Sequence, residues 1–135
     1  MKKSTALKGA LGSLLAVAAT TAVASSPAEA VYDCRTGEVC FYHDQNYRGT
    51  VAVIAGFAYK GAKVNDFRNF RYTNGQNLND SVSSIRNLTS FTLRVHEHGT
   101  WGGKWIELKP GQSEDLYNSY ETPLSNDSAS SAQLK

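Results

Sequence analysis

The chain lacks the features of a membrane protein or a helical protein. Its one long apolar run, residues 10–23, has 14 residues, whereas a membrane-spanning helix needs about 20. Beyond Cys40 few segments have apolar residues at helical spacing. The sequence therefore predicts a chain that is neither membrane-spanning nor mainly helical.

The apolar run belongs to an N-terminal segment that has the order of a secretory signal peptide. Residues 1–30 contain a basic start, the Ala/Leu/Val-rich run and a small-residue end, "AEA" at 28–30. We expect cleavage after Ala30, which leaves residues 31–135 as one secreted domain without membrane contact. A retained membrane anchor is the alternative.

An excess of charge is also missing from the expected mature chain. Without residues 1–30, 11 of the 14 basic and 11 of the 12 acidic residues remain, so the net charge is zero. Proteins that bind nucleic acid usually carry a basic excess. We therefore expect neither a nucleic acid nor an anionic membrane surface as the partner.

Cysteine is scarce, with only Cys34 and Cys40 in the chain. An even pair separated by five residues, including Gly37, predicts a disulfide around a tight turn in an exported protein. A metal-binding pair or a reactive thiol are the alternatives, although no histidine lies within the turn. A loop this short removes little entropy from the unfolded chain, so the core must supply most of the stability.

The rest of the sequence consists of short strand-like runs, and part of it occurs twice. Runs such as "TVAVI" and "KWIEL" are separated by Gly, Asn and Asp, which predicts strands and turns. Residues 39–54 align with 93–108 at an offset of 54. Each copy predicts a hairpin with an aromatic residue and, two places later, a Gly that needs positive φ or close packing. The matched positions are Tyr42 with His96, Tyr47 with Trp101, and Gly49 with Gly103.

Two polar hexads follow the hairpins in the same order. "NDSVSS" at 79–84 and "NDSASS" at 126–131 agree at five of six positions. The seven-residue difference in spacing falls in the middle segments, where loops absorb length at little cost. The sequence therefore predicts an all-β chain with two motifs, at about 38–88 and 91–135.

The motifs resemble the βγ-crystallin Greek-key signature, in which an aromatic hairpin such as "YHDQNYRG" precedes a hexad of this type. The resemblance covers nearly all of 39–131. It implies a sandwich of two four-stranded sheets, with about eight strands in two Greek-key motifs. His96 departs from the family, which usually has an aromatic residue there, but its flat ring can still lie over the hairpin.

The resemblance also implies paired Ca²⁺ sites, each completed by the other hexad. Ca²⁺ takes 6–8 oxygen ligands, and each hexad offers amide, carboxylate, hydroxyl and carbonyl oxygens. Ser81 and Ser128 would act through their carbonyls, while Ser84 and Ser131 would pin the hairpins by hydrogen bonds. A polar turn that satisfies its own backbone is the alternative. The implied ligands are Asn79, Asp80, Ser81 and Ser83 in one arm, Asn126, Asp127, Ser128 and Ser130 in the other, and hairpin carbonyls near Asp44 and Glu97.

Other chemistries have weaker patterns. His96, His98 and His43 suggest zinc, but the HExxH spacing is absent and no third ligand is evident. No Ser-His-Asp or Cys-His arrangement is present, so an enzyme is not expected. Trp101 and Trp105 resemble a carbohydrate platform, but Trp101 belongs to the hairpin and only Trp105 is expected to be exposed.

The leading functional hypothesis is a secreted, monomeric, non-enzymatic calcium-binding domain. The alternative is an inhibitor of an extracellular protease, because the layout is similar to the metalloproteinase-inhibitor family I36, whose members also carry an N-terminal cysteine-bearing segment. A toxin-like or cell-surface protein is a third possibility. For an inhibitor, the 55–78 loop is the expected contact segment, although its aromatic residues could instead belong to the core. These aromatic residues are Tyr59, Phe67, Phe70 and Tyr72.

Overall fold

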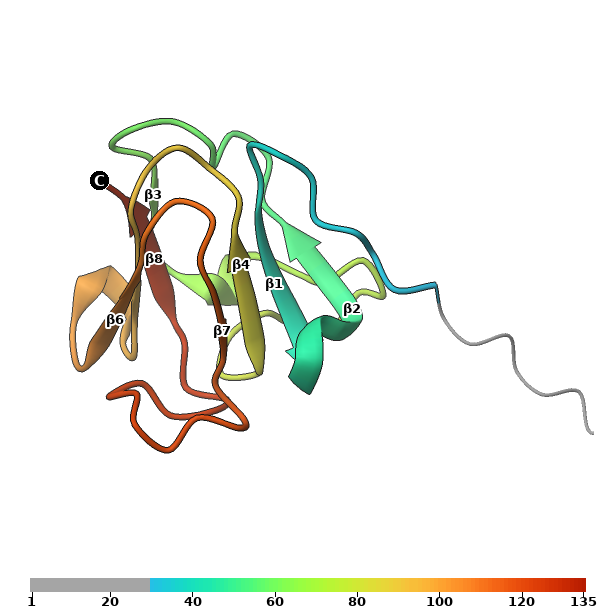
Figure 1. The fold of residues 1–135 in the computed structure, drawn as a ribbon. Coiled ribbons are helices and arrows are strands. Elements are labelled where there is room, and N and C mark those ends of the chain that lie inside the picture. The colour runs from blue at the N-terminus through green and yellow to red at the C-terminus, as the bar shows by residue number, and fades with distance from the viewer. Residues whose placement is uncertain (1–29) are drawn as a thin grey trace, which may run out of the picture.

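The computed structural model describes residues 30–135, so the expected signal peptide lies outside the described residues except for Ala30. Within the described part, no helix has the length and apolar character needed to cross a membrane. Eight strands and three 3₁₀ turns follow one another along the chain (Figure 1). They are β1 (Val39–Asp44), η1 (Gln45–Tyr47), β2 (Arg48–Val53), β3 (Lys63–Val64), η2 (Phe67–Asn69), β4 (Ser84–Asn87), β5 (Leu93–His96), η3 (Gly99–Trp101), β6 (Trp105–Leu108), β7 (Ser113–Asp115) and β8 (Ser131–Leu134).

The strands form two four-stranded antiparallel sheets, in the orders β2-β1-β4-β7 and β3-β8-β5-β6. The predicted all-β sandwich is confirmed. The third strand of each motif belongs to the sheet of the other motif: β3 pairs with β8, and β7 pairs with β4. The two halves are therefore interlocked, and the hexads that precede β4 and β8 are brought to the same end of the sandwich.

Strand β1 of the first sheet is buried on both of its faces. One face packs into the main core, where the rings of Phe41 and Phe67 meet edge to face at 5.1 Å. The other face carries Cys40, Tyr42 and Val51, which form a second buried cluster with the N-terminal segment. Every residue of β1 from Val39 to Tyr42 is buried for this reason.

The N-terminal segment covers the outer face of the first sheet and is tied to it by the predicted disulfide. Cys34 and Cys40 are bonded, with their Cα atoms 6.0 Å apart, so the disulfide is confirmed. The Tyr42 hydroxyl donates a hydrogen bond to the carbonyl of Tyr32 at 2.9 Å. The segment is therefore part of the packed structure.

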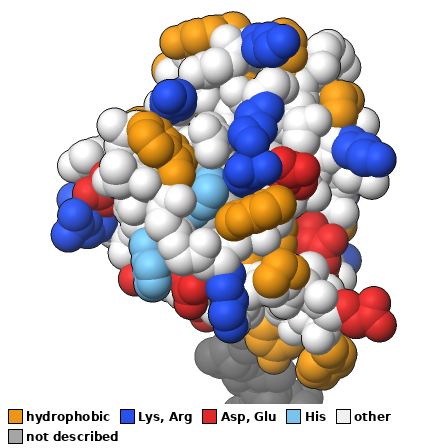
Figure 2. Space-filling view, turned by 90° about the vertical axis from the view of Figure 1, so that its left-hand side faces the viewer, with side chains coloured by type: hydrophobic (Ala, Val, Ile, Leu, Met, Phe, Trp, Pro, Cys, Tyr) orange, Lys and Arg blue, Asp and Glu red, His pale blue; other side chains and the backbone are white. Residues whose placement is uncertain are grey.

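The outer face of the second sheet has no such cover among the described residues. Basic side chains gather there around a histidine and hydrophobic groups (Figure 2). Trp105 is 43% exposed, as expected, but the Arg94 guanidinium lies over its ring, 4.0 Å from the centroid. Lys63 lies over the Trp101 ring in the same way, at 4.7 Å. Each cation covers one face of its ring, so that face is not open for a sugar to stack on.

The two hairpins need glycine for both of the predicted reasons. Gly49 and Gly103 have φ of +75° and +73°, a region that side chains disfavour. A Cβ atom at Gly49 would lie 2.5 Å from the Asp44 carboxylate, and one at Gly103 would lie 2.7 Å from the His98 ring. The close neighbour at Gly49 is thus a carboxylate and not the packed aromatic ring.

Candidate metal centre

The backbones of the two hexads are joined to each other. The Asp80 amide donates to the carbonyl of Ala129 at 3.1 Å, and the Asp127 amide donates to the carbonyl of Val82 at 3.2 Å. Asp80 and Asp127 both have left-handed backbones, with φ of 53° and 57°. Asp tolerates this conformation better than most residues. The second residue of each hexad is therefore directed at the other hexad.

The side chains repeat this exchange. Ser130 Oγ donates to Asp80 Oδ1 at 3.0 Å, and Ser83 Oγ donates to Asp127 Oδ1 at 3.4 Å. Each pair joins a hydroxyl of one arm to a carboxylate of the other. The structure thus brings these four predicted ligand residues together as two equivalent pairs.

Ser84 and Ser131 attach the hairpins to these pairs, as predicted. Ser84 Oγ donates to the Asp44 carbonyl at 2.6 Å and accepts from the Tyr47 amide at 2.9 Å. Ser131 Oγ donates to the His98 carbonyl at 2.6 Å and accepts from the Trp101 amide at 3.1 Å. The counterpart of Asp44 in the second motif is therefore His98. Its neighbour Glu97, near which the sequence implied a ligand carbonyl, is the counterpart of His43.

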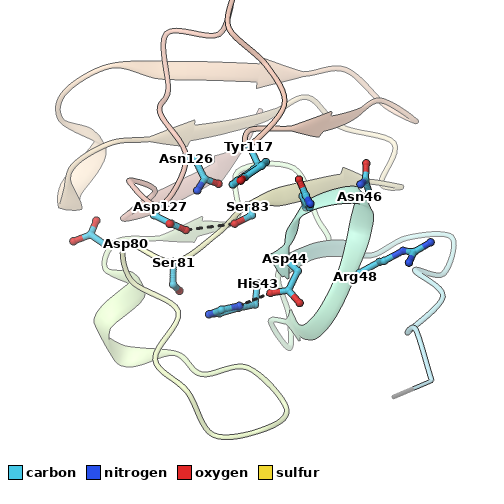
Figure 3. A pocket seen from close by; sticks show the side chains of 11 residues that line it. His43, Asp44, Asn46, Arg48, Asp80, Ser81, Ser83, Tyr117, Asn126 and Asp127 are labelled. Carbon is cyan, nitrogen blue, oxygen red and sulfur yellow. Dashed lines mark hydrogen bonds and ion pairs between the residues drawn. The ribbon is translucent and has the colours of Figure 1, made fainter. Parts of the chain in front are cut away.

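A hollow of about 670 Å³ lies beside the Ser83–Asp127 pair. Figure 3 shows this pair on one side and His43 with Asp44 on the other, while the carboxylate of Asp80 points away. His43 Nδ1 lies 2.7 Å from Asp44 Oδ1. The other residues that line it are Gln45, Asn46, Arg48, Asp80, Ser81, Tyr117 and Asn126.

A second hollow, of about 440 Å³, lies beside the Ser130–Asp80 pair. Glu97 and His98 line it in the positions that His43 and Asp44 have in the first hollow. Arg68 donates hydrogen bonds to the Asp66 carboxylate there and holds the pKa of Asp66 below its ordinary value. The two hollows are thus alike in plan but differ in the charged groups around them.

The remaining predicted ligands lie in the same two arms. The hydroxyl of Ser128 donates to the carbonyl of Ser125 at 2.6 Å, and that of Ser81 donates to the carbonyl of Leu78 at 2.9 Å. Both hydroxyls are therefore engaged within their own arms. Asn79 donates its amide to Asp80 Oδ2 at 2.8 Å. Asn126 Oδ1 is buried beside the first hollow without a hydrogen-bond partner.

The donor set fits a hard divalent cation. Each hollow is lined by an aspartate and a serine from different hexads and by residues of a hairpin, and the first adds the unpartnered amide oxygen of Asn126. Hard cations prefer such oxygen ligands. In residues 30–135, the side chains that meet at the spacing of a Cys/His/carboxylate metal cluster are Cys34, Glu38 and Cys40. Both thiols of that group are in the disulfide, so the zinc alternative gains no support.

The expected contact loop of an inhibitor does not have the predicted exposure. Phe67 and Tyr72 are buried in the core, Phe70 packs against it, and only Tyr59 of the four aromatic residues is exposed. The alternative weighed for them, sandwich core, is correct for Phe67 and Tyr72. The most exposed aromatic residue is instead Tyr120, which the sequence pattern did not single out.

Solved βγ-crystallin domains share this fold. A domain from work on the evolution of the eye-lens βγ-crystallin fold is similar with a TM-score of 0.58 and 25% identity, over 78% of this chain and 92% of that one. A βγ-crystallin from Ciona intestinalis has a TM-score of 0.54 and 22% identity, over 73% and 100% of the two chains. A double mutant of a domain from Clostridium beijerinckii has a TM-score of 0.51 and 20% identity, over 73% and 97%.

The sequence itself matches one family. No curated protein matches the chain. The model of peptidase inhibitor family I36 matches residues 27–108, which is more than half of the chain. This stretch includes the disulfide, the first motif and the second hairpin, and ends before the second hexad. The chain has the βγ-crystallin fold and belongs to peptidase inhibitor family I36.

Proposed function

We propose that the protein is a secreted, monomeric and non-enzymatic calcium-binding domain with two Ca²⁺ sites shared between its hexads. The observation that carries this proposal is the exchange of side chains, in which Ser83 meets Asp127 and Ser130 meets Asp80. A turn that satisfied only its own backbone would need no carboxylate from a residue 44 or 50 positions away. When Ca²⁺ bound, the ion would replace the serine O–H hydrogen bond as the partner of each carboxylate, and the serine hydroxyls would keep their protons.

Each site would draw on three chain segments. The first would be held by Ser83, Asp127 and a carbonyl of the first hairpin, with Asn126 Oδ1 within the same wall. The second would be held by Ser130, Asp80 and a carbonyl near Glu97 and His98. Bound Ca²⁺ supplies positive charge that ties these segments together, and it stabilises the fold because it binds only the native chain. With one Asp carboxylate per site, we expect dissociation constants of roughly 10⁻⁶ to 10⁻³ M.

Calorimetric titration with Ca²⁺ tests the proposal. The wild-type protein should bind two ions, Asp80→Ala and Asp127→Ala should each lose one site, and the double variant should bind none. Asp33→Ala is the matched control, because it removes an exposed carboxylate outside both hollows. The proposal would be contradicted if the wild-type protein gave no binding heat at millimolar calcium, or if the variants still bound two ions.

Secretion is part of the same proposal. The disulfide supports an oxidising compartment, and the leader-like order of residues 1–30 predicts cleavage after Ala30. N-terminal sequencing of protein recovered from the culture medium should begin at Val31. Protein that remains in the cell with Met1 would contradict it.

Peptidase inhibition is the second candidate function, because the chain belongs to family I36. It is compatible with calcium binding, since the ions would stabilise the inhibitory scaffold. Purified protein should lower the initial rate of at least one endopeptidase in a competitive manner. A panel of metallo- and serine endopeptidases tests this directly, and the panel must include thermolysin because of the family resemblance.

A further inference from the structure

The segment between β7 and the second hexad presents the most exposed aromatic side chain of the described chain, Tyr120. We call residues 116–125 the β7–β8 loop; it extends beyond the end of the sandwich (Figure 1). Tyr120 is 98% exposed and Tyr117 is 57% exposed. An almost fully exposed aromatic ring on a protruding loop is accessible to a partner, which makes this loop a candidate contact surface.

The loop is held firmly at both ends. Leu116 and Leu124 are buried in the core on either side of the exposed stretch. At the first end, the Asp115 carboxylate accepts hydrogen bonds from the Tyr117 amide at 3.2 Å and from the Asn118 side chain at 2.7 Å. At the second end, Thr122 Oγ1 donates to the Leu124 carbonyl at 2.9 Å. A loop fixed in this way loses less entropy when it binds a partner.

The central backbone of the loop has no backbone hydrogen-bond partner among the described residues. No backbone-to-backbone hydrogen bond joins residues 118–126 to any other residue of the described chain. Peptidases bind extended segments of their substrates, and an exposed backbone with unpaired donors and acceptors can add to a strand of an enzyme. Side chains engage the Asn118 amide and the Leu124 and Ser125 carbonyls. The stretch 119–123 between them makes no backbone-to-backbone hydrogen bond in the described chain. A loop with this free central stretch, an almost fully exposed aromatic side chain and two buried anchors thus has the form of a restrained substrate.

A hollow beside the loop extends the same surface. It has a volume of about 410 Å³ and lies between Glu121, Thr122 and Pro123 of the loop and strand β6. The exposed Trp105 lines it. A partner that engaged the loop would therefore meet a second large aromatic group, and Trp and Tyr are the residues most enriched at the energetic centres of interfaces.

We propose that the β7–β8 loop is the segment that contacts the peptidase, and that Tyr120 enters the specificity pocket of an endopeptidase that accepts large aromatic side chains. This inference rests on the second candidate function and names the surface that performs it. It replaces the 55–78 loop, whose aromatic residues Phe67 and Tyr72 are buried. It does not depend on calcium binding.

Inhibition constants against chymotrypsin, subtilisin, thermolysin and trypsin test this proposal, with the full chain secreted from an expression host. Truncation of a central aromatic anchor costs about 2–4 kcal/mol, so Tyr120→Ala should raise the inhibition constant roughly 30- to 1000-fold. Tyr59→Ala is the matched control, because Tyr59 is also exposed, at 63%, but lies on the 55–78 loop. It should change the constant less than about twofold.

A substitution that changes specificity makes the test sharper. Chymotrypsin has an apolar specificity pocket, whereas the pocket of trypsin carries a carboxylate. Tyr120→Lys should therefore weaken inhibition of chymotrypsin and create inhibition of trypsin. Because the Tyr120 side chain is almost wholly exposed, both variants should melt at the wild-type temperature.

The outcomes separate the two proposals. If the wild type inhibits an enzyme and Tyr120→Ala inhibits it equally well, the loop assignment is overturned while the inhibitor function stands. If the wild type inhibits no enzyme of the panel, the inhibitor function is overturned and the loop assignment with it. Loss of inhibition in Tyr120→Ala with Tyr59→Ala unchanged supports both.

Discussion

At Ser84 and Ser131, one buried hydroxyl holds each hairpin against its hexad. Ser84→Ala would leave the Asp44 carbonyl and the Tyr47 amide without their partner. Leaving such groups unpaired costs about 1–3 kcal/mol, so we expect the free energy of unfolding to fall by that amount. Chemical denaturation in the presence of a chelator measures it. Exposed Ser90 is the control; Ser90→Ala should stay within about 0.5 kcal/mol of wild type, and equal values for both variants would refute the pinning role.

His96 gives the stability a pH dependence. Burial lowers its pKa below the ordinary value, and the charges of Arg94 and Lys135 act in the same direction. The unfolded chain takes up this proton near pH 6.5, while the folded chain takes it up only at lower pH. The free energy of unfolding should therefore fall as the pH drops below about 6.5, until the folded pKa is reached.

The matched variant for this effect is His96→Tyr, because Tyr42 occupies the equivalent position of the first motif. Thermal unfolding from pH 7.5 to pH 5, with a chelator present, should show a smaller fall for His96→Tyr than for wild type. Ser90→Ala provides the comparison and should keep the wild-type slope, because the exposed Ser90 side chain carries no titratable group in this range. An unchanged slope in His96→Tyr would assign the pH dependence to other groups.

At the scale of the element, the first hairpin depends on Gly49 for space as well as for φ. Gly56 has a similar φ, +79°, but open space where its Cβ would lie. In both Gly→Ala variants the free energy of unfolding should fall by about 1–2 kcal/mol, because alanine disfavours this backbone conformation. The fall should be about 1 kcal/mol larger for Gly49→Ala, because its Cβ would displace the Asp44 carboxylate. Equal losses in chemical denaturation would mean that Asp44 moves aside without cost.

The β7–β8 loop should respond to calcium. Tyr117, near its start, lines the first hollow, and Asp127, which follows its end, belongs to the same hollow. An ion held there would restrict both ends, so hydrogen exchange of amides 117–126 should slow when Ca²⁺ is added. Amides of the 55–61 segment, which lines neither hollow, should exchange at the same rate with and without the ion. A uniform response of both segments would argue against a local effect.

Single elements also show where sequence reasoning reaches its limit. Phe67 and Tyr72 lie in a stretch without strand periodicity, and each packs against a distant ring, Phe67 against Phe41 and Tyr72 against His43. Such packing cannot be inferred from local pattern. The role of His98, by contrast, could be inferred from the sequence. The offset of 54 that matches Tyr42 to His96 also matches Asp44 to His98. Attention to acidic residues favoured Glu97 instead.

For the whole molecule, the duplication made the fold predictable. Two hairpins and two hexads in the same order predicted an all-β chain of two motifs. The resemblance of these motifs to the βγ-crystallin signature implied the sandwich of two four-stranded sheets, which the structure confirms. The pattern did not reveal that the N-terminal segment covers one sheet face while the equivalent face stays open. That difference arises from the disulfide-bearing segment, which lies outside the repeat and has no counterpart in the second motif.

The central claim is that cations bind between the two hexads and stabilise the interlocked fold. Its most direct test is the melting temperature of the wild type and of the Asp80→Ala/Asp127→Ala double variant, each with chelator and with calcium at about 100 times the wild-type dissociation constant from the titration. An ion at 100 times its dissociation constant adds about 2.7 kcal/mol per site, and each kcal/mol raises the melting temperature by about 4–8 °C. We predict a rise of at least about 10 °C for the wild type and none for the double variant. No rise in the wild type, or the same rise in both proteins, would contradict the claim.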